Sequence, residues 1–310
     1  AGIFMCLKVI NIKPGDEVIV PNLTFIATAT PAIWLRAKIV LCDVDKENFC
    51  LDLNHLEKLI TKKTKCIIPV HLYGHCCNLN SLFKIAKKNK IYIIEDAAQA
   101  IGAKYNGKFL GTIADFGGFS FYGNKIITTG EGGIILFKKK KFYKKLYSLK
   151  NHGREKKGIF KHKTIGYNFM FTEMQAAVGN IQLKKLNKIL NKKKYIYNFY
   201  KKNLSNINEI SFMKPIKSNE PVYWFSNILV NKKKQLKRFL FQNGIQARDM
   251  FLPLNLQPCF KNKNYIKNLK GDFKKSEEIY NKGISLPSHY NLKIEDLKYI
   301  SSKINNFFKK

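Results

Sequence analysis

The feature that most constrains the fold is a series of short apolar runs in the N-terminal third of the chain. These runs predict strands at residues 17–20, 38–44, 66–70 and 91–94. Residues 53–60 and 79–89, which lie between them, have the apolar spacing of amphipathic helices. Because parallel strands need long crossover connections, this alternation predicts an α/β fold with a mostly parallel sheet. The helices are expected on both faces of that sheet.

The C-terminal part is expected to form a smaller α+β domain. Thr172 is the expected N-cap of a long helix that runs to about Leu204. The apolar residues of this helix predict a buried face, formed by Met174, Ala177, Val178, Ile181 and Leu186. Strands are predicted at 223–230 and 284–287, and helices at 232–243 and 294–308. We place the boundary on the long helix, with a large domain at 1–185 and a small domain at 186–310.

The composition is that of a folded globular protein with a sizeable core, at 310 residues and 45% hydrophobic. No run approaches the ~18 apolar residues of a membrane span, and the first residues, AGIFMCLKVI, lack the pattern of a signal peptide. A membrane role is therefore not expected. The missing initiator methionine predicts an N-terminally truncated chain.

The net charge of +35 is extreme and, taken alone, favours a nucleic-acid or anionic partner. Only four of the 56 basic residues are arginine, however, and phosphate or base recognition favours the planar arginine side chain. The lysines are scattered along the chain together with many Asn and Ile residues, which indicates compositional drift. We therefore expect no nucleic-acid partner, although a positive field would also attract small anionic ligands.

The cysteines indicate a reducing, cytoplasmic location. There are seven, an odd number, and they form no C-x-x-C motif. His71, His75, Cys76 and Cys77 are close in sequence, but their spacing matches no common zinc pattern, so no metal is expected.

One lysine differs from the rest in its neighbours. Lys125 follows an aromatic run, FSFYGN, and precedes the flexible turn TTGEGG, so it is flanked by apolar and small residues. A lysine in such a setting loses hydration, which lowers its pKa and favours the neutral amine needed to attack a carbonyl group. An ordinary solvated lysine is the alternative.

An acidic pair ends the strand predicted at 91–94. Glu95 and Asp96 are followed by two alanines and Gln99. Ligands of open α/β sheets bind beyond the carboxyl ends of the strands. An acid there and a lysine on a neighbouring loop together suit a pyridine cofactor, because the acid keeps the ring nitrogen protonated while the lysine forms the covalent link.

Four stretches resemble the sugar aminotransferases of the DegT/DnrJ/EryC1/StrS family, which use pyridoxal 5'-phosphate. They are HLYG at 71–74, EDAAQA at 95–100, SFYGNKIITTGEGG at 120–133 and GYNFMFTEMQAA at 166–177. The resemblance covers the whole chain, and within the family the lysine loop is most similar to that of GDP-perosamine synthases. It implies a fold-type I transferase that moves the amino group of glutamate to a nucleotide-linked 4-keto-6-deoxy sugar in surface-polysaccharide (O-antigen) synthesis.

The resemblance also implies residue roles. Lys125 would hold the cofactor covalently and then act as acid and base, and its presence favours transamination over the dehydration performed by relatives with His there. Four further residues would contact the cofactor, through ring stacking, the ring nitrogen, the ring hydroxyl and the phosphate respectively: Phe25, Asp96, Gln99 and Ser120. Asn168 would reach the phosphate in a neighbouring subunit, which implies a homodimer with composite active sites.

Two departures from the family pattern stand out. The chain starts after the point where the family has a Ser-Gly-Thr segment that binds the phosphate, so cofactor binding is expected to be weakened. The family also commonly has Arg at the position of Met170.

Alternatives remain open. The nucleotide could be UDP or dTDP, and neither the sugar nor the aminated carbon follows from the sequence. A basic nucleic-acid-binding or regulatory protein on an inactive enzyme scaffold, or a decayed fragment, would explain the same residues without catalysis.

Overall fold

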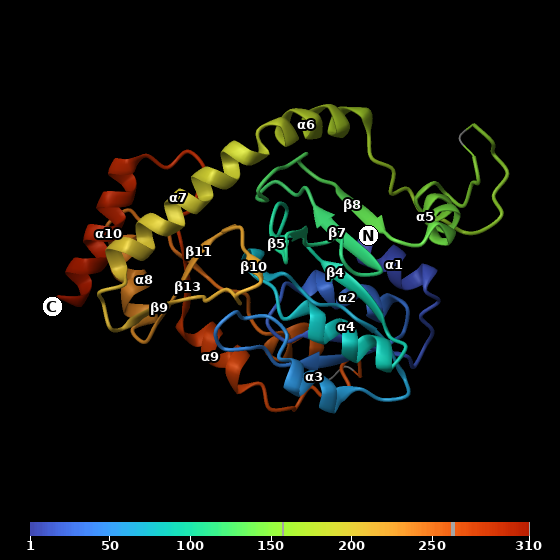
Figure 1. The fold of residues 1–310 in the computed structure, drawn as a ribbon, viewed down its shortest axis with the longest axis horizontal. Helices are drawn as coiled ribbons and strands as arrows, with labels where there is room; N and C mark the ends of the chain where they lie inside the picture. The colour runs from blue at the N-terminus through green and yellow to red at the C-terminus, as the bar shows by residue number, and fades with distance from the viewer. Residues whose placement is uncertain (157, 262–263, 310) are drawn as a thin grey trace.

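A six-stranded sheet forms the centre of the first half of the chain (Figure 1). The computed structural model describes residues 1–156, 158–261 and 264–309. The strand order is β2-β1-β3-β4-β7-β8, and every pair is parallel except β7 with β8. The strands are β1 (Glu17–Pro21), β2 (Lys38–Cys42), β3 (Thr64–Ile67), β4 (Tyr92–Asp96), β7 (Phe116–Ser120) and β8 (Gly133–Phe137). The mostly parallel sheet predicted from the alternating pattern is confirmed.

Helices cover both faces of this sheet, as expected. Successive side chains of a strand point to opposite faces, so Val18 joins one buried cluster and Ile19 joins another. The Val18 face is covered by α1 (Gly2–Val9), α2 (Thr30–Trp34) and α5 (Tyr143–Lys150). The Ile19 face is covered by α3 (Leu53–Leu59) and α4 (Leu79–Lys88).

A second, smaller region is built on an antiparallel sheet of order β12-β13-β11-β9. Its strands are β9 (Ile210–Phe212), β11 (Ser226–Val230), β12 (Arg248–Asp249) and β13 (Gly283–Leu286). Three helices enclose its core, namely α7 (Leu186–Leu204), α8 (Lys233–Gln242) and α10 (Ile294–Phe308). The α+β character predicted for the C-terminal part is therefore confirmed.

The long helix predicted from Thr172 is two helices. Thr172 caps α6 (Glu173–Lys184) through a reciprocal pair of hydrogen bonds with Gln175, as its position predicted. At Lys185 the backbone changes to φ −90° and ψ −5°, and α7 begins at the next residue.

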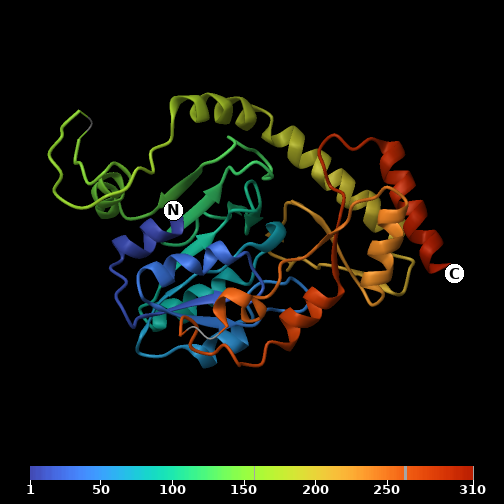
Figure 2. The same cartoon turned by 180° about the vertical axis from the view of Figure 1, so that it is seen from behind.

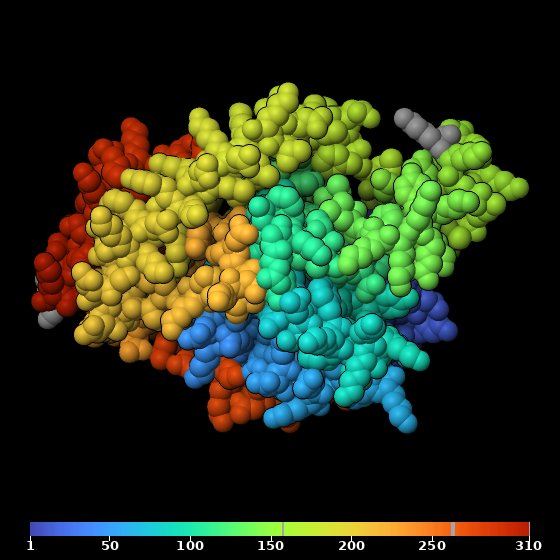
Figure 3. All heavy atoms as spheres, in the orientation of Figure 1, coloured from blue at the N-terminus to red at the C-terminus, as the bar shows by residue number. Residues whose placement is uncertain are grey.

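The face of α6 that we predicted to be buried is exposed. Met174 is 79% exposed and Ile181 51% exposed, and none of the α6 side chains is buried. Leu186, at the start of α7, does pack against the core of the large sheet. The prediction of a buried face is therefore wrong for α6 within the described chain, where nothing covers these side chains and α6 runs along the rim of the molecule (Figure 3).

Part of the C-terminal half returns to the large sheet (Figure 2). Leu254, Phe260 and Phe273 lie in the buried cluster on the Val18 face, followed by α9 (Lys274–Lys282). A small sheet also joins the halves, since β10 (Asn219–Glu220) pairs with β5 (Lys104–Tyr105), which pairs with β6 (Lys108–Phe109). The boundary at residue 185 stays a prediction.

Among the described residues, no helix has the length and apolar character needed to cross a membrane.

Candidate active site

The carboxylate of Asp96 is anchored at the end of β4 by two hydrogen bonds. The Thr28 hydroxyl donates to Oδ2 at 2.7 Å, and the backbone N–H of Ala98 donates to Oδ1 at 3.1 Å. Asp96 is buried, so these donors fix its orientation in place of water. Thr28 had not been singled out from the sequence, because nothing local to it shows that it meets a strand that lies 68 residues further on.

Lys125 lies on the loop that follows the neighbouring strand, β7. Its backbone N–H donates to the carbonyl oxygen of Tyr122 at 2.9 Å, which makes a turn, and the Thr129 N–H closes the loop onto Phe121 at 2.9 Å. Burial lowers the pKa of the Lys125 amine, while the nearby Asp96 carboxylate acts in the opposite direction. The amine and the carboxylate are thus close enough to influence each other, and Lys125 is not an ordinary solvated lysine.

The other acid of the pair, Glu95, is fully buried and points away from Asp96. Its Oε2 atom accepts hydrogen bonds from Nε2 of His71 at 2.9 Å and from the N–H of Gly111 at 2.7 Å. Its Oε1 atom accepts from the N–H groups of Ile113 and Ala114 at 2.7 and 2.6 Å. All of its acceptor positions are used within the protein, so Glu95 holds the scaffold and only Asp96 is available to a ligand.

The space beside Asp96 fits a flat ring. In the β4–β7 ladder Asp96 pairs with Gly118, and a Cβ atom at Gly118 would meet no heavy atom within 4 Å. Ser120, two residues further along the same strand, points to the same face as Gly118. An amine, a carboxylate and a hydroxyl therefore surround an open part of the sheet, which matches the groups that pyridoxal phosphate requires.

Aromatic side chains line this region. The ring of Phe25 is 53% exposed, and its centroid lies 5.7 Å from that of Phe251. Phe251 in turn stacks on Tyr73, with the centroids 5.6 Å apart. Trp224 lies over Lys125, whose Nζ atom is 4.2 Å from the ring centroid. Tyr73, Trp224 and Phe251 were not predicted as site residues. Tyr73 belongs to the HLYG stretch at 71–74, but Trp224 and Phe251 belong to none of the motifs and come from distant segments.

Gln99 is buried, and the oxygen of its side-chain amide has a hydrogen-bond partner. The Oε1 atom accepts a hydrogen bond from the backbone N–H of Tyr73 at 2.8 Å. This bond fixes the amide orientation and leaves the NH2 group as a donor.

Asn168 lies elsewhere. It is exposed and forms an isolated antiparallel bridge with Asn151, at the end of α5. Among the described residues it makes no hydrogen bond to the groups around Lys125, and the neighbouring Met170 is also exposed. The structure thus brings Lys125 and Asp96 together with Gln99 and Ser120 nearby, but does not bring Asn168 to them within one chain.

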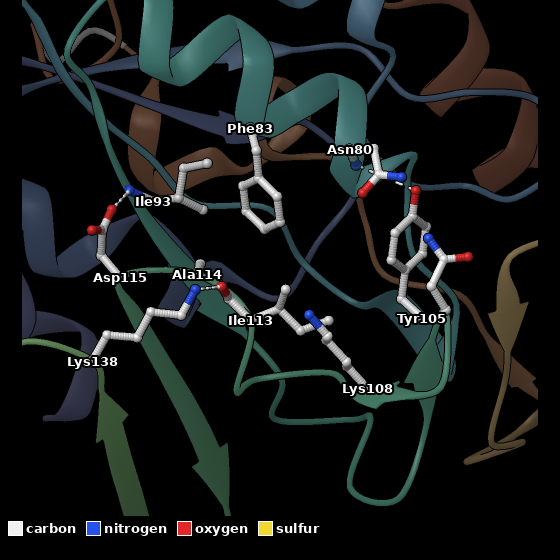
Figure 4. Close-up of a pocket in the computed structure, with 10 residues that line it drawn as sticks. Asn80, Phe83, Ile93, Tyr105, Lys108, Ile113, Ala114, Asp115 and Lys138 are labelled. Carbon is white, nitrogen blue, oxygen red and sulfur yellow. Dashed lines mark hydrogen bonds between the residues drawn. The ribbon is translucent and has the colours of Figure 1, made fainter.

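A hollow of about 370 Å³ lies at the amino ends of β4 and β7, whereas Asp96 lies at the carboxyl end of β4 (Figure 4). Phe83 and Tyr105 line it together with Lys108 and Lys138. None of the residues predicted to contact a cofactor lines this hollow, so it is not the candidate active site.

Among the described residues, no group of three or more His, Cys, Asp or Glu side chains is arranged to hold a metal ion.

Comparison with known proteins agrees with the geometry. The DegT/DnrJ/EryC1/StrS aminotransferase family matches residues 1–305. The GDP-perosamine synthase of Escherichia coli O157:H7 is 35% identical over 310 residues, which are 99% of this chain and 83% of that protein.

Solved structures agree as well. DesV of S. venezuelae, solved in complex with a ketimine intermediate, has a TM-score of 0.94 at 28% identity, over 100% of this chain and 82% of that chain. Spr1654 of Streptococcus pneumoniae in its PLP form has a TM-score of 0.91 at 28% identity, over 99% of this chain and 84% of that chain. The fold-type I architecture expected from the sequence is confirmed, and the chain belongs to the DegT/DnrJ/EryC1/StrS family of pyridoxal-phosphate-dependent sugar aminotransferases.

Proposed function

We propose that this sugar aminotransferase transfers the amino group of glutamate to a nucleotide-linked 4-keto-6-deoxy sugar, in the manner of a GDP-perosamine synthase. The product would serve surface-polysaccharide synthesis. The observation that carries the proposal is the pairing of a partly desolvated amine, Lys125, with the anchored carboxylate of Asp96. The similarity to GDP-perosamine synthase of E. coli supports GDP as the nucleotide.

Lys125 is the proposed catalytic residue. Its burial favours the neutral amine, so Nζ would be able to hold the cofactor covalently and, once glutamate has taken its place, to accept a proton. In the first half-reaction Nζ would carry a proton from the glutamate carbon that bears the amino group to a carbon of the cofactor, and in the second it would carry a proton from that cofactor carbon to the sugar carbon. Bound pyridoxal phosphate would supply the electron sink for the pair that deprotonation leaves on the glutamate carbon.

The other proposed contacts orient the cofactor. Asp96 pairs with the ring nitrogen, and its bonds to Thr28 and Ala98 keep it in place. The free NH2 group of Gln99 donates to the ring hydroxyl, Phe25 packs on the ring face, and the Ser120 hydroxyl binds the phosphate.

We further propose a homodimer with composite active sites. Support comes from α6, where three apolar side chains with the spacing of a buried face are exposed: Met174, Val178 and Ile181. A second copy of the chain would cover this face. It would also give Asn168, which lies outside the site in its own chain, a place near the cofactor phosphate of the partner.

A cytoplasmic location is part of the same proposal. All seven cysteines have free thiols, and six of them are buried. A nucleotide sugar and glutamate are also substrates expected in that compartment.

The test is cofactor loading followed by single turnover. The protein is incubated with pyridoxal phosphate, and the visible absorption of the protein-bound cofactor is followed as glutamate and then a nucleotide keto sugar are added. We expect Lys125→Ala to lose the band of covalently bound cofactor and all turnover. Lys108→Ala, which changes a lysine that lines the hollow at the amino ends of β4 and β7, is the matched control and should behave like the wild type.

A panel of GDP-, UDP- and dTDP-linked keto sugars identifies the acceptor, with the aminated product detected by mass spectrometry. Turnover by Lys125→Ala, or turnover with none of the panel by a loaded wild-type protein, would refute the proposal. Tight, steeply salt-dependent DNA binding without cofactor uptake would favour the regulatory alternative instead.

A further inference from the structure

We propose that Trp224 is a positioning residue. It would fix the position of the lysine loop, residues 120–133, relative to the C-terminal part of the chain. The inference rests on the proposed role of Lys125 and names a residue outside the motifs of the lysine loop and the acidic pair. Trp224 lies in the segment that leads into β11, about a hundred residues after Lys125 in sequence. Three of its groups make separate contacts: the indole N–H, the ring face and the backbone carbonyl.

The indole N–H holds the backbone beside the lysine. It donates to the carbonyl oxygen of Asn124 at 2.8 Å, and Asn124 is the residue immediately before Lys125. The loop contains Gly123 and several further glycines, so its backbone has few conformational restraints of its own. A hydrogen bond from a rigid, buried ring fixes the peptide from which the Lys125 side chain extends.

The ring face controls the surroundings of the amine. Nζ of Lys125 is 4.2 Å from the Trp224 centroid, well within the range of cation–π attraction. The ring therefore both excludes water from the amine and stabilises its charged form. Asp96 is the charged group that acts on the same amine from the sheet. Phe225 stacks on the indole with centroids 4.2 Å apart, so the ring has little freedom to move.

The backbone carbonyl of Trp224 is tied to α7 by a second lysine. Lys193 is buried, and its Nζ atom donates to the carbonyl oxygens of Trp224 at 2.9 Å and of Ser288 at 2.7 Å. Burial lowers the pKa of Lys193 to about 8. A buried amine that donates to two carbonyl groups has a structural role, and here it connects α7 to the residue that covers the proposed catalytic lysine.

The test separates the three contacts by substitution. Trp224→Phe keeps a ring face but removes the N–H, while Trp224→Leu keeps apolar cover and removes both. Lys193→Met removes the two hydrogen bonds of the Lys193 amine without a large change in volume. Trp34→Phe is the matched control, because Trp34 is the only other tryptophan and is 64% exposed.

Two readouts are used, and the first needs no cofactor. In the cofactor-free protein, the pH dependence of Lys125 acylation is measured by competitive labelling and mass spectrometry. For Trp224→Leu we expect Lys125 to be labelled at lower pH than in the wild type, because the charged amine loses its aromatic partner while staying shielded from water. Trp224→Phe should change the labelling profile little.

The second readout is the dissociation constant of pyridoxal phosphate, measured by titration. Loss of one hydrogen bond to the loop should weaken binding roughly tenfold in Trp224→Phe, and Lys193→Met should weaken it in the same direction. Lys193→Arg, which keeps a charged donor, should recover part of the loss. Far-ultraviolet circular dichroism and thermal melting identify any variant that fails to fold, and the remaining variants then decide the outcome.

The inference is overturned if folded Trp224 variants match Trp34→Phe in both the labelling profile and the cofactor affinity. Its failure is distinguishable from failure of the proposed function. A wild-type protein that takes up no cofactor refutes the function, whereas the labelling profile of Lys125 still reports on Trp224.

Discussion

Glu95→Gln should destabilise the fold strongly although Glu95 is not in the active site. The substitution keeps the shape of the side chain, so its effect comes from charge and hydrogen bonding alone. The glutamine carbonyl can still face Ile113 and Ala114, but the NH2 group then faces the N–H of Gly111, which is also a donor.

The size of this destabilisation follows from the four hydrogen bonds that the Glu95 carboxylate accepts. An orphaned buried N–H costs about 1–3 kcal/mol, and each remaining bond loses about 1 kcal/mol when the acceptor is no longer charged. We therefore expect the free energy of unfolding to fall by roughly 3–5 kcal/mol. Urea denaturation at neutral pH measures this change, and Glu57→Gln, at an exposed glutamate of α3, is the control.

The pH dependence of the same variant supplies a second measurement. Burial acts to raise the pKa of Glu95, but the hydrogen bonds from His71 and the amides outweigh it and lower the pKa from its usual 4.5. A lowered pKa in the folded state means that the stabilisation is fully present above the unfolded-state value and is lost as the pH falls through the folded-state value. The wild type should therefore lose more stability below about pH 4.5 than Glu95→Gln does. Equal stability at neutral pH, or equal acid sensitivity, would refute this reasoning.

Three further predictions concern other parts of the molecule. Asp96→Asn should leave the free energy of unfolding nearly unchanged but slow the glutamate half-reaction by about 100-fold or more, measured by single-turnover absorbance; an unaffected rate would contradict the role of Asp96. Gly74→Ala should destabilise by more than about 3 kcal/mol, because a Cβ there would lie 1.9 Å from the Val222 carbonyl oxygen, whereas Gly15→Ala, also at positive φ but with open space, should cost much less in the same melting experiment. Ile181→Glu should shift the protein from dimer to monomer in light scattering, since Ile181 is 51% exposed on α6, and a monomeric wild type would count against the proposed assembly.

The large sheet and the nearness of Lys125 to Asp96 could be predicted because their signals are local. A strand buried on both faces reads as a continuous apolar run, which located β4, and Asp96 follows from its place at the end of that strand. Lys125 was identified by its apolar neighbours alone, and its burial in the structure has the expected effect on its pKa.

The rest of the site depends on contacts between distant segments. The hydroxyl of Thr28 and the indole of Trp224 reach the site from segments 68 residues before Asp96 and 100 residues after Asn124. No periodicity or motif in either segment points to such a contact. The exposed apolar face of α6 shows a different limit of prediction from sequence. Apolar spacing predicts which face of a helix avoids water, but not whether the surface that covers it belongs to the same chain.

The adjacent acids of β4 illustrate how scaffold and site are connected. Side chains alternate along a strand, so Glu95 and Asp96 must point to opposite faces of the sheet. Glu95 clamps the backbone of residues 111–114, which lead directly into β7. β7 carries Gly118 and Ser120 and opens into the lysine loop. The loop is therefore held from two directions, from the sheet through Glu95 and from α7 through Lys193 and Trp224. Weakening either set of contacts should change the position of the Lys125 amine relative to Asp96 without altering either side chain.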